Sequence, residues 1–229
     1  YDESDLAFIA RLLAEVRIWY RFPSHDPLRI DVREFHDDQR NYQFNIELLA
    51  DLAESHMQVG NTMEAFNLYV ILSQMQPDNS YFKICRARIL YREKQYEECI
   101  AASKAIIAHD SIPEILSMTG DAYKYIGQAD SALVYYNHVL AIRPGHVPTM
   151  SKKADILLSK KQYLPVMDMS REYLREDPDN MTMLPIYGLA LHLQGSYPLS
   201  LEQFEHQREL GDDSYAVHYY LGMNHYMMD

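Results

Sequence analysis

The stretch GDAYKYIGQADSALVYYNHVLAIRP, residues 120–144, places small, aromatic and turn-forming residues at fixed intervals. After the opening glycine, another glycine follows seven positions on, an alanine twelve, a tyrosine sixteen and a proline twenty-four. The inner glycine separates two segments of helical periodicity, and the proline ends the second segment. The stretch therefore predicts two helices joined by a tight turn.

The same spacing recurs along the chain. Steps of 33 or 34 residues from Gly120 reach an alanine or a glycine each time. These first-helix markers are Ala53, Ala87, Gly120, Ala154, Gly188 and Gly222. Twelve positions later lie small or β-branched residues: Ala65, Cys99, Ala132, Val166 and Ser200. A fixed period of this length indicates an array of helical repeats.

Each part of the pattern has a physical reason. Small residues at both positions let two antiparallel helices approach closely. Gly60, Gly127 and Gly195 fall where a first helix should end, and glycine readily adopts the left-handed C-cap conformation there. Lys94 and Lys161 stand at the corresponding places, so we expect them to adopt this conformation despite their Cβ atoms.

The pattern resembles the tetratricopeptide repeat (TPR) family over residues 46–229, about four-fifths of the chain. The resemblance implies an all-α fold, a right-handed α-solenoid of helix-turn-helix repeats. The expected repeats are 46–79, 80–112, 113–146, 147–180 and 181–214, with a partial repeat at 215–229. Two repeats carry serine, at Ser103 and Ser170, where the family has an aromatic residue. A degenerate solenoid of the HEAT type is the alternative, although its period is longer.

Residues 1–45 do not follow the repeat spacing. Their apolar N-terminal helix pattern favours an N-terminal helical cap and linker, because a terminal repeat otherwise exposes its core face. The alternative is a segment that lies in the binding groove and blocks it.

The C-terminal segment 215–229 reads as a first helix without its partner. Its large apolar residues lack an obvious cover: Tyr219, Tyr220, Leu221, Met223, Tyr226 and Met227. Three explanations stay open: the natural protein continues past residue 229, the covering helix is disordered, or a second copy covers this face in a homodimer. The first is favoured over the homodimer.

Composition limits the class of protein. The 229 residues carry a net charge of −12, which repels phosphate backbones and argues against nucleic-acid binding. Cys85 and Cys99 do not form a disulfide framework or a zinc motif, and are expected to be buried as small apolar residues. No uninterrupted apolar run is long enough for a membrane span. The compartment stays open: the cytoplasm, or the periplasm or exterior if a leader was removed.

No catalytic motif is present in the sequence, including HExxH, GxSxG, GxGxxG and the phosphate loop. We therefore expect no enzyme activity, no catalytic residues, no cofactor and no metal site. His218 and His225 share one helix face, in positions where other repeats have apolar residues. They are interpreted as histidines packed in the core rather than as metal ligands.

The TPR resemblance implies that the first helices line a concave groove that binds a peptide or protein. The groove residues predicted on this basis are Tyr81, Arg88, Tyr91, Arg92, Asp121, Lys124 and Tyr125. Arginine and tyrosine are common anchors of interfaces, and arginine grips carboxylates, so an acidic or C-terminal segment fits. The alternative is that the arginines only form ion pairs with Glu54 or Asp121 of neighbouring helices.

The predicted function is a non-enzymatic scaffold for protein–protein interaction. Its alternative is a sensor or docking domain of a larger regulator or enzyme whose active part lies outside this chain. The lysine and asparagine positions with which chaperone-binding TPRs hold a terminal carboxylate are not matched here, so that subclass is not expected.

Overall fold

The computed structural model describes residues 39–229, with side chains from Ile46 onward. The chain divides into two compact units, residues 1–48 and residues 49–229. The predicted cap over residues 1–45, and its groove-blocking alternative, rest on residues 1–38, which lie outside the described residues.

Residues 39–229 form helices and no strand. The helices are α2 (Gln39–Gln58), α3 (Thr62–Met75), α4 (Ser80–Arg92), α5 (Tyr96–Ile107), α6 (Pro113–Tyr125), α7 (Ala129–Ile142), α8 (Val147–Ser159), α9 (Tyr163–Glu176), α10 (Met183–Gln194), α11 (Tyr197–Glu209) and α12 (Tyr215–Met228). The prediction of an all-α fold is confirmed.

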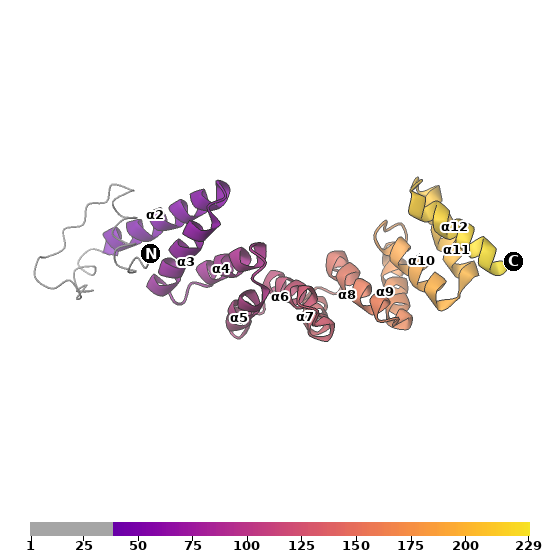
Figure 1. Ribbon diagram of the computed structural model, residues 1–229, viewed down its shortest axis with the longest axis horizontal. Helices are drawn as coiled ribbons and strands as arrows, with labels where there is room; N and C mark the ends of the chain where they lie inside the picture. The colour runs from indigo at the N-terminus through magenta and orange to yellow at the C-terminus, as the bar shows by residue number, and fades with distance from the viewer. Residues whose placement is uncertain (1–38) are drawn as a thin grey trace, which may run out of the picture. The chain divides into compact units, whose positions relative to one another are not determined.

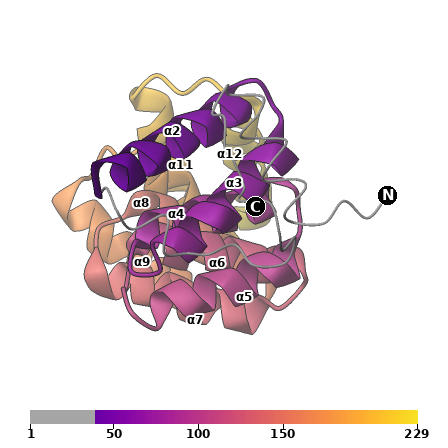
Figure 2. The same ribbon diagram turned by 90° about the vertical axis from the view of Figure 1, so that its left-hand side faces the viewer.

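Within residues 49–229, each helix from α3 to α12 packs against the next one along the chain. Contacts also join α4 to α6, α8 to α10 and α10 to α12, so first helices meet across successive pairs. In Figures 1 and 2, α5 and α7 lie on the same side of α4 and α6. The first helices therefore share one side of this part of the stack, and the second helices share the other.

The core of each pair forms at the markers. Ala87 and Ala154 on first helices are fully buried, as are Cys99 and Ala132 on second helices. Ala87, Cys99 and Ala132 belong to an apolar cluster that reaches from α4 to Ile156 on α8, and Ala154 belongs to a second cluster with Val166 and Ala190. The small residues thus lie where the helices approach each other, as the spacing predicts.

The helical glycines make room for aromatic rings. A Cβ atom on Gly120 would lie 2.6 Å from Cε1 of Tyr136, and one on Gly188 would lie 2.9 Å from Cε2 of Phe204. These rings come sixteen residues after their glycines. In the two repeats with serine at that place, the marker is alanine, and both serines are fully buried. Two kinds of hairpin contact therefore alternate from α4 to α11.

The turns inside the hairpins use the left-handed conformation that the sequence predicts. Gly127 has a φ of 79° and Gly195 a φ of 87°. Lys94 and Lys161 have φ values of 60° and 58° without the freedom of glycine. The backbone N–H of Lys94 donates to the carbonyl of Tyr91, and that of Lys161 donates to the carbonyl of Leu158. These hydrogen bonds hold both lysines in the turn.

Two further features bear on the class of protein. Cys85 and Cys99 are both buried and carry free thiols. In the described part of the chain, no helix combines the length and apolar character that a membrane crossing requires.

Candidate functional site

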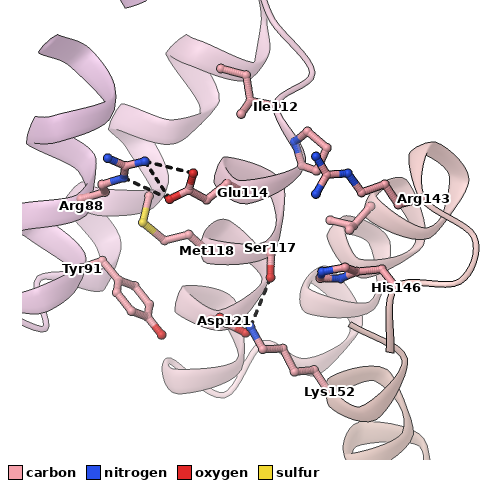
Figure 3. Close-up of a pocket in the computed structure, with 12 residues that line it drawn as sticks. Arg88, Tyr91, Ile112, Glu114, Ser117, Met118, Asp121, Arg143, His146 and Lys152 are labelled. Atoms are coloured by element: carbon pink, nitrogen blue, oxygen red, sulfur yellow. Dashed lines mark hydrogen bonds and ion pairs between the residues drawn. The ribbon is translucent and has the colours of Figure 1, made fainter. Parts of the chain in front are cut away.

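A cavity of about 620 Å³ opens between α4, α6, α7 and α8 and the loops beside them (Figure 3). It lies within residues 49–229 and combines charged, polar and apolar side chains. The lining residues are Arg88, Tyr91, Ile112, Pro113, Glu114, Ser117, Met118, Asp121, Val139, Arg143, His146 and Lys152.

One wall of the cavity is an arginine–carboxylate pair. Arg88 on α4 donates from Nη2 to both carboxylate oxygens of Glu114 on α6, at 2.8 and 2.9 Å, and from Nε to Oε1 at 3.1 Å. Both side chains are partly exposed, so the pair contributes at most about 1 kcal/mol to stability. Its main effect is to hold the guanidinium plane in place beside the cavity.

Asp121 on α6 joins three helices. Its Oδ2 accepts a hydrogen bond from Lys152 Nζ on α8 at 2.6 Å, and its Oδ1 accepts one from the Tyr136 hydroxyl on α7 at 2.7 Å. Lys152 Nζ also donates to Ser117 Oγ at 3.2 Å. Burial raises the pKa of Tyr136 above its usual value of 10.0, and the hydrogen bond to Asp121 adds to the shift.

Arg143 and His146 come from the loop between α7 and α8 (Figure 3). Arg143 is exposed, and no ion-pair partner for it is found among the described residues. His146 is half-buried, and its Nδ1 lies 2.8 Å from Thr149 Oγ1. Because Glu114 and Asp121 are each paired with a cation, Arg143 gives the lining one excess positive charge. That excess stands out in a chain whose net charge is −12.

Beside the cavity lies a group of three rings that we term the tyrosine cluster: Tyr91, Tyr96 and Tyr125. The rings of Tyr96 and Tyr125 stack with centroids 4.8 Å apart. Tyr91, which also lines the cavity, has its ring centroid 5.9 Å from that of Tyr96 and 6.3 Å from that of Tyr125. Burial raises the pKa of Tyr91, and the nearby Asp121 carboxylate raises it further.

The residues predicted from the sequence occupy two neighbouring places. Arg88, Tyr91 and Asp121 line the cavity, and Tyr125 contacts Tyr91 next to it. Lys124 is paired instead with Asp155 on α8, at 3.2 Å.

Tyr81 and Arg92, also predicted, are not among the lining residues of this cavity. The exposed ring of Tyr81 packs edge-on against Phe82, with centroids 5.7 Å apart. Arg92 is exposed at the end of α4 and follows Tyr91 of the tyrosine cluster.

The ion pairs differ from those considered in the sequence. Arg88 pairs with Glu114 rather than with Glu54 or Asp121, because Glu114 opens α6 opposite Arg88. Asp121 pairs with Lys152. For Arg92, no ion pair is found within the described region.

Sequence reasoning missed Arg143, His146 and Lys152. The TPR resemblance directed attention to five positions on each first helix, and none of these three residues occupies one of them. Arg143 directly precedes the repeat proline Pro144, so its position in the sequence alone places this cation at the end of a second helix.

The interpretation of His218 and His225 as core histidines is wrong. Both are exposed on α12, and His218 Nε2 lies 2.5 Å from Asp213 Oδ1. The buried polar residue of α12 is Asn224, which lies 2.7 Å from His192 Nδ1 and donates to Ser200 Oγ at 2.9 Å. The register of α12 thus turns an amide, not an imidazole, toward α10 and α11.

Only some of the apolar residues of α12 are exposed, whereas the sequence led us to expect that all of them lack a cover. Leu221 is buried with Phe204 and Val217, and the ring of Tyr220 stacks on Phe204 with centroids 5.0 Å apart. Tyr219 and Tyr226 remain exposed. The helix α11 covers one side of α12 and leaves the other side open.

Within residues 39–229, no group of three or more His, Cys, Asp or Glu side chains is arranged to hold a metal ion. The described cavity combines two paired carboxylates, the aromatic ring of Tyr91 and the unpaired guanidinium of Arg143.

Comparison with solved structures identifies the fold. A tetratricopeptide repeat protein from Parabacteroides merdae ATCC 43184 is 16% identical, with a TM-score of 0.67 over 80% of this chain and 73% of that one. MamA from Desulfovibrio magneticus RS-1 is 22% identical, with a TM-score of 0.59 over 66% and 86%. YrrB, described as a TPR protein with an unusual peptide-binding site, is 12% identical, with a TM-score of 0.63 over 82% and 94%.

No protein-family model matches the chain, and no curated protein matches it by sequence. The structural matches and the repeated helix pairs confirm the resemblance: the chain has the fold of the TPR proteins, an all-α solenoid of helix-turn-helix repeats.

Proposed function

We propose that the chain is a non-enzymatic interaction scaffold whose cavity between α4, α6, α7 and α8 binds an acidic segment of a peptide or protein. The observation that carries the proposal is the charge of the lining. Its two carboxylates are already paired with Arg88 and Lys152, whereas Arg143 has no partner among the described residues. A carboxylate from a ligand supplies the missing partner, and arginine can bind it through two parallel hydrogen bonds.

Two further facts support the proposal. The cavity is lined by helices and inter-repeat loops that the repeat packing already holds in place, so little conformational freedom is lost when a ligand binds. A solved structure of the same fold, YrrB, is described as having a peptide-binding site. The same surface would serve a docking domain of a larger regulator.

The test is a selection of random twelve-residue peptides on the immobilised protein, followed by affinity measurement by fluorescence anisotropy. We expect the selected peptides to be enriched in aspartate and glutamate. Arg143→Glu should weaken their binding by about tenfold or more, equivalent to about 1.4 kcal/mol. Arg208→Glu is the matched control, because Arg208 is exposed on α11 and outside the lining.

The proposal fails if the selection yields no binder, or if the binders are not acidic. It also fails if both charge reversals weaken binding equally, because overall charge rather than the cavity would then govern affinity.

We also propose, as a second function, that α12 pairs with α12 of a second copy. Tyr215, Tyr219, Gly222 and Tyr226 follow one another at intervals of four, three and four, which places them on one helix face. Space beside Gly222 is open, whereas an aromatic ring fills the space beside Gly120 and Gly188. An antiparallel copy sets Tyr219 of each chain against Gly222 of the other, and Tyr215 against Tyr226.

Light scattering after size exclusion tests the pairing. A dimer gives twice the monomer mass of 26.8 kDa. Tyr219→Glu should return the monomer, whereas Leu164→Glu, which changes an exposed apolar residue on α9, should leave the dimer intact. A monomer at every concentration for the unchanged protein would refute the pairing.

A further inference from the structure

The tyrosine cluster forms an aromatic surface that continues the cavity. Tyr91 belongs to both, and its ring contacts Tyr96 and Tyr125. Tyr96 comes from the start of α5, whereas Tyr91 and Tyr125 come from the ends of α4 and α6. Three helix ends therefore converge on this one surface.

Tyr125 is the exposed member of the cluster. It is 63% exposed, although one face of its ring is stacked on Tyr96 with an interplanar angle of 10°. Because these contacts fix the orientation of the ring, a ligand that stacks on its open side need not order it first. Neither the paired charges of the cavity nor the core packing accounts for a large ring held this way in solvent.

The surrounding charges select the chemistry of the ligand. Arg92 is exposed beside Tyr91 and has no ion pair within the described region, whereas the charge of Arg88 is paired with Glu114. A cationic side chain stacked on the cluster would meet the positive charge of Arg92, so lysine or arginine is disfavoured. A neutral aromatic side chain extends the stack of Tyr96 and Tyr125 without that repulsion.

We infer that the site recognises a two-part determinant: an acidic residue held at Arg143 in the cavity, and an aromatic residue stacked on Tyr125, in one extended segment. The inference rests on the proposed function, because the acidic residue is the ligand group proposed there. Tyr91 links the two parts, and its ring centroid lies 6.3 Å from that of Tyr125. An extended peptide advances about 3.3 Å per residue, so a single short segment can pass from the cavity along Tyr91 to Tyr125.

The probes are the tightest-binding peptide from the selection and two analogues of it. One analogue replaces its aromatic residue by alanine, and the other replaces its acidic residues by the corresponding amides. Each probe is titrated against the unchanged protein, Tyr125→Ala, Tyr125→Phe and Arg143→Glu. Leu164→Ala is the control, because Leu164 is a large exposed side chain on α9, outside both the cluster and the cavity.

We expect loss of the peptide's aromatic residue to weaken binding to the unchanged protein by about three- to tenfold. The same change should have little effect on binding to Tyr125→Ala, because the stacking partner is already gone. Tyr125→Phe should keep most of the affinity, since it retains the ring. Replacing the acidic residues by amides should weaken binding to the unchanged protein and to Tyr125→Ala alike, and should have little effect on binding to Arg143→Glu.

The outcomes separate the two proposals. Acidic peptides that bind without any aromatic residue would leave the proposed function standing and overturn the two-part inference. An aromatic effect that persists in Tyr125→Ala, or that Leu164→Ala abolishes, would also overturn it. A selection without acidic binders would refute both.

Discussion

At the scale of single residues, the contact between Gly120 and Tyr136 shows how this hairpin closes. The ring lies where a Cβ atom on Gly120 would stand, and it cannot easily swing away, because its hydroxyl donates to Asp121 at 2.7 Å. Tyr136 is fully buried, so its neighbours also restrain it. One hydrogen bond thus links the packing of α6 and α7 to the wall of the cavity.

We predict that Gly120→Ala destabilises the protein by about 1–3 kcal/mol, because the added methyl group overpacks the α6–α7 contact. The gain in helix propensity, about 1 kcal/mol, offsets part of this cost. The measurement is the urea unfolding midpoint followed by circular dichroism.

The matched control is Gly222→Ala, measured together with Tyr219→Glu so that α12 is unpaired, because a Cβ atom at Gly222 meets open space in the single chain. This variant should be as stable as Tyr219→Glu alone, or more stable by up to about 1 kcal/mol. Equal shifts of the midpoint for both glycine substitutions would show that the ring of Tyr136 yields without cost.

At the scale of helices and turns, the left-handed residues distinguish two types of hairpin. Glycine adopts positive φ freely, whereas a residue with a Cβ atom is strained there. Lys94 and Lys161 carry that strain after α4 and α8. Their hairpins are also the ones with serine at the aromatic position, so both departures from the repeat pattern fall in the same repeats.

We predict that Lys94→Gly stabilises the protein by about 0.5–1 kcal/mol, since glycine relieves the strain of the left-handed C-cap. The reverse change, Gly127→Lys, should destabilise by a similar amount. Both are measured as shifts of the urea midpoint. A loss of stability in Lys94→Gly would mean that contacts of the lysine side chain outweigh the backbone strain.

At the scale of the whole molecule, tyrosine burial links stability to alkaline pH. Burial raises the pKa of Tyr69, Tyr91 and Tyr136 above their usual value of 10.0. In the unfolded chain these phenols ionise near pH 10, but in the folded protein they keep their protons. The stability they contribute is therefore fully present below pH 10 and is lost as the pH rises above it.

We predict that the free energy of unfolding falls above pH 10 by about 1.4 kcal/mol per pH unit for each such tyrosine. Urea titrations between pH 8 and pH 11 measure this slope. Tyr136→Phe should reduce the slope by the contribution of one group. An unchanged slope in Tyr136→Phe would contradict the assignment to this buried ring.

Much of the fold can be predicted from the sequence, because the repeat spacing reflects local packing rules. The markers give the helix contacts, and the C-cap positions of Lys94 and Lys161 follow from the repeat frame. The site is less predictable. Arg143 lines the cavity only because the packing sets the end of α7 beside α6. The ion-pair partner of Arg88 likewise depends on which carboxylate the packing brings opposite it.

The alternation between glycine–ring and alanine–serine contacts has a consequence for how such hairpins can change in evolution. Conversion of one kind into the other takes two substitutions, and each single step leaves either a crowded or a hollow contact. The crowded intermediate, alanine beside a ring, costs less stability than the hollow one, glycine beside serine. Removal of a buried aromatic ring from a core destabilises a protein by about 3–5 kcal/mol. Ala53 and Tyr69, both buried at the corresponding places of α2 and α3, have the composition of that cheaper intermediate. A lineage moving between the two kinds would therefore pass through hairpins that pair alanine with an aromatic residue.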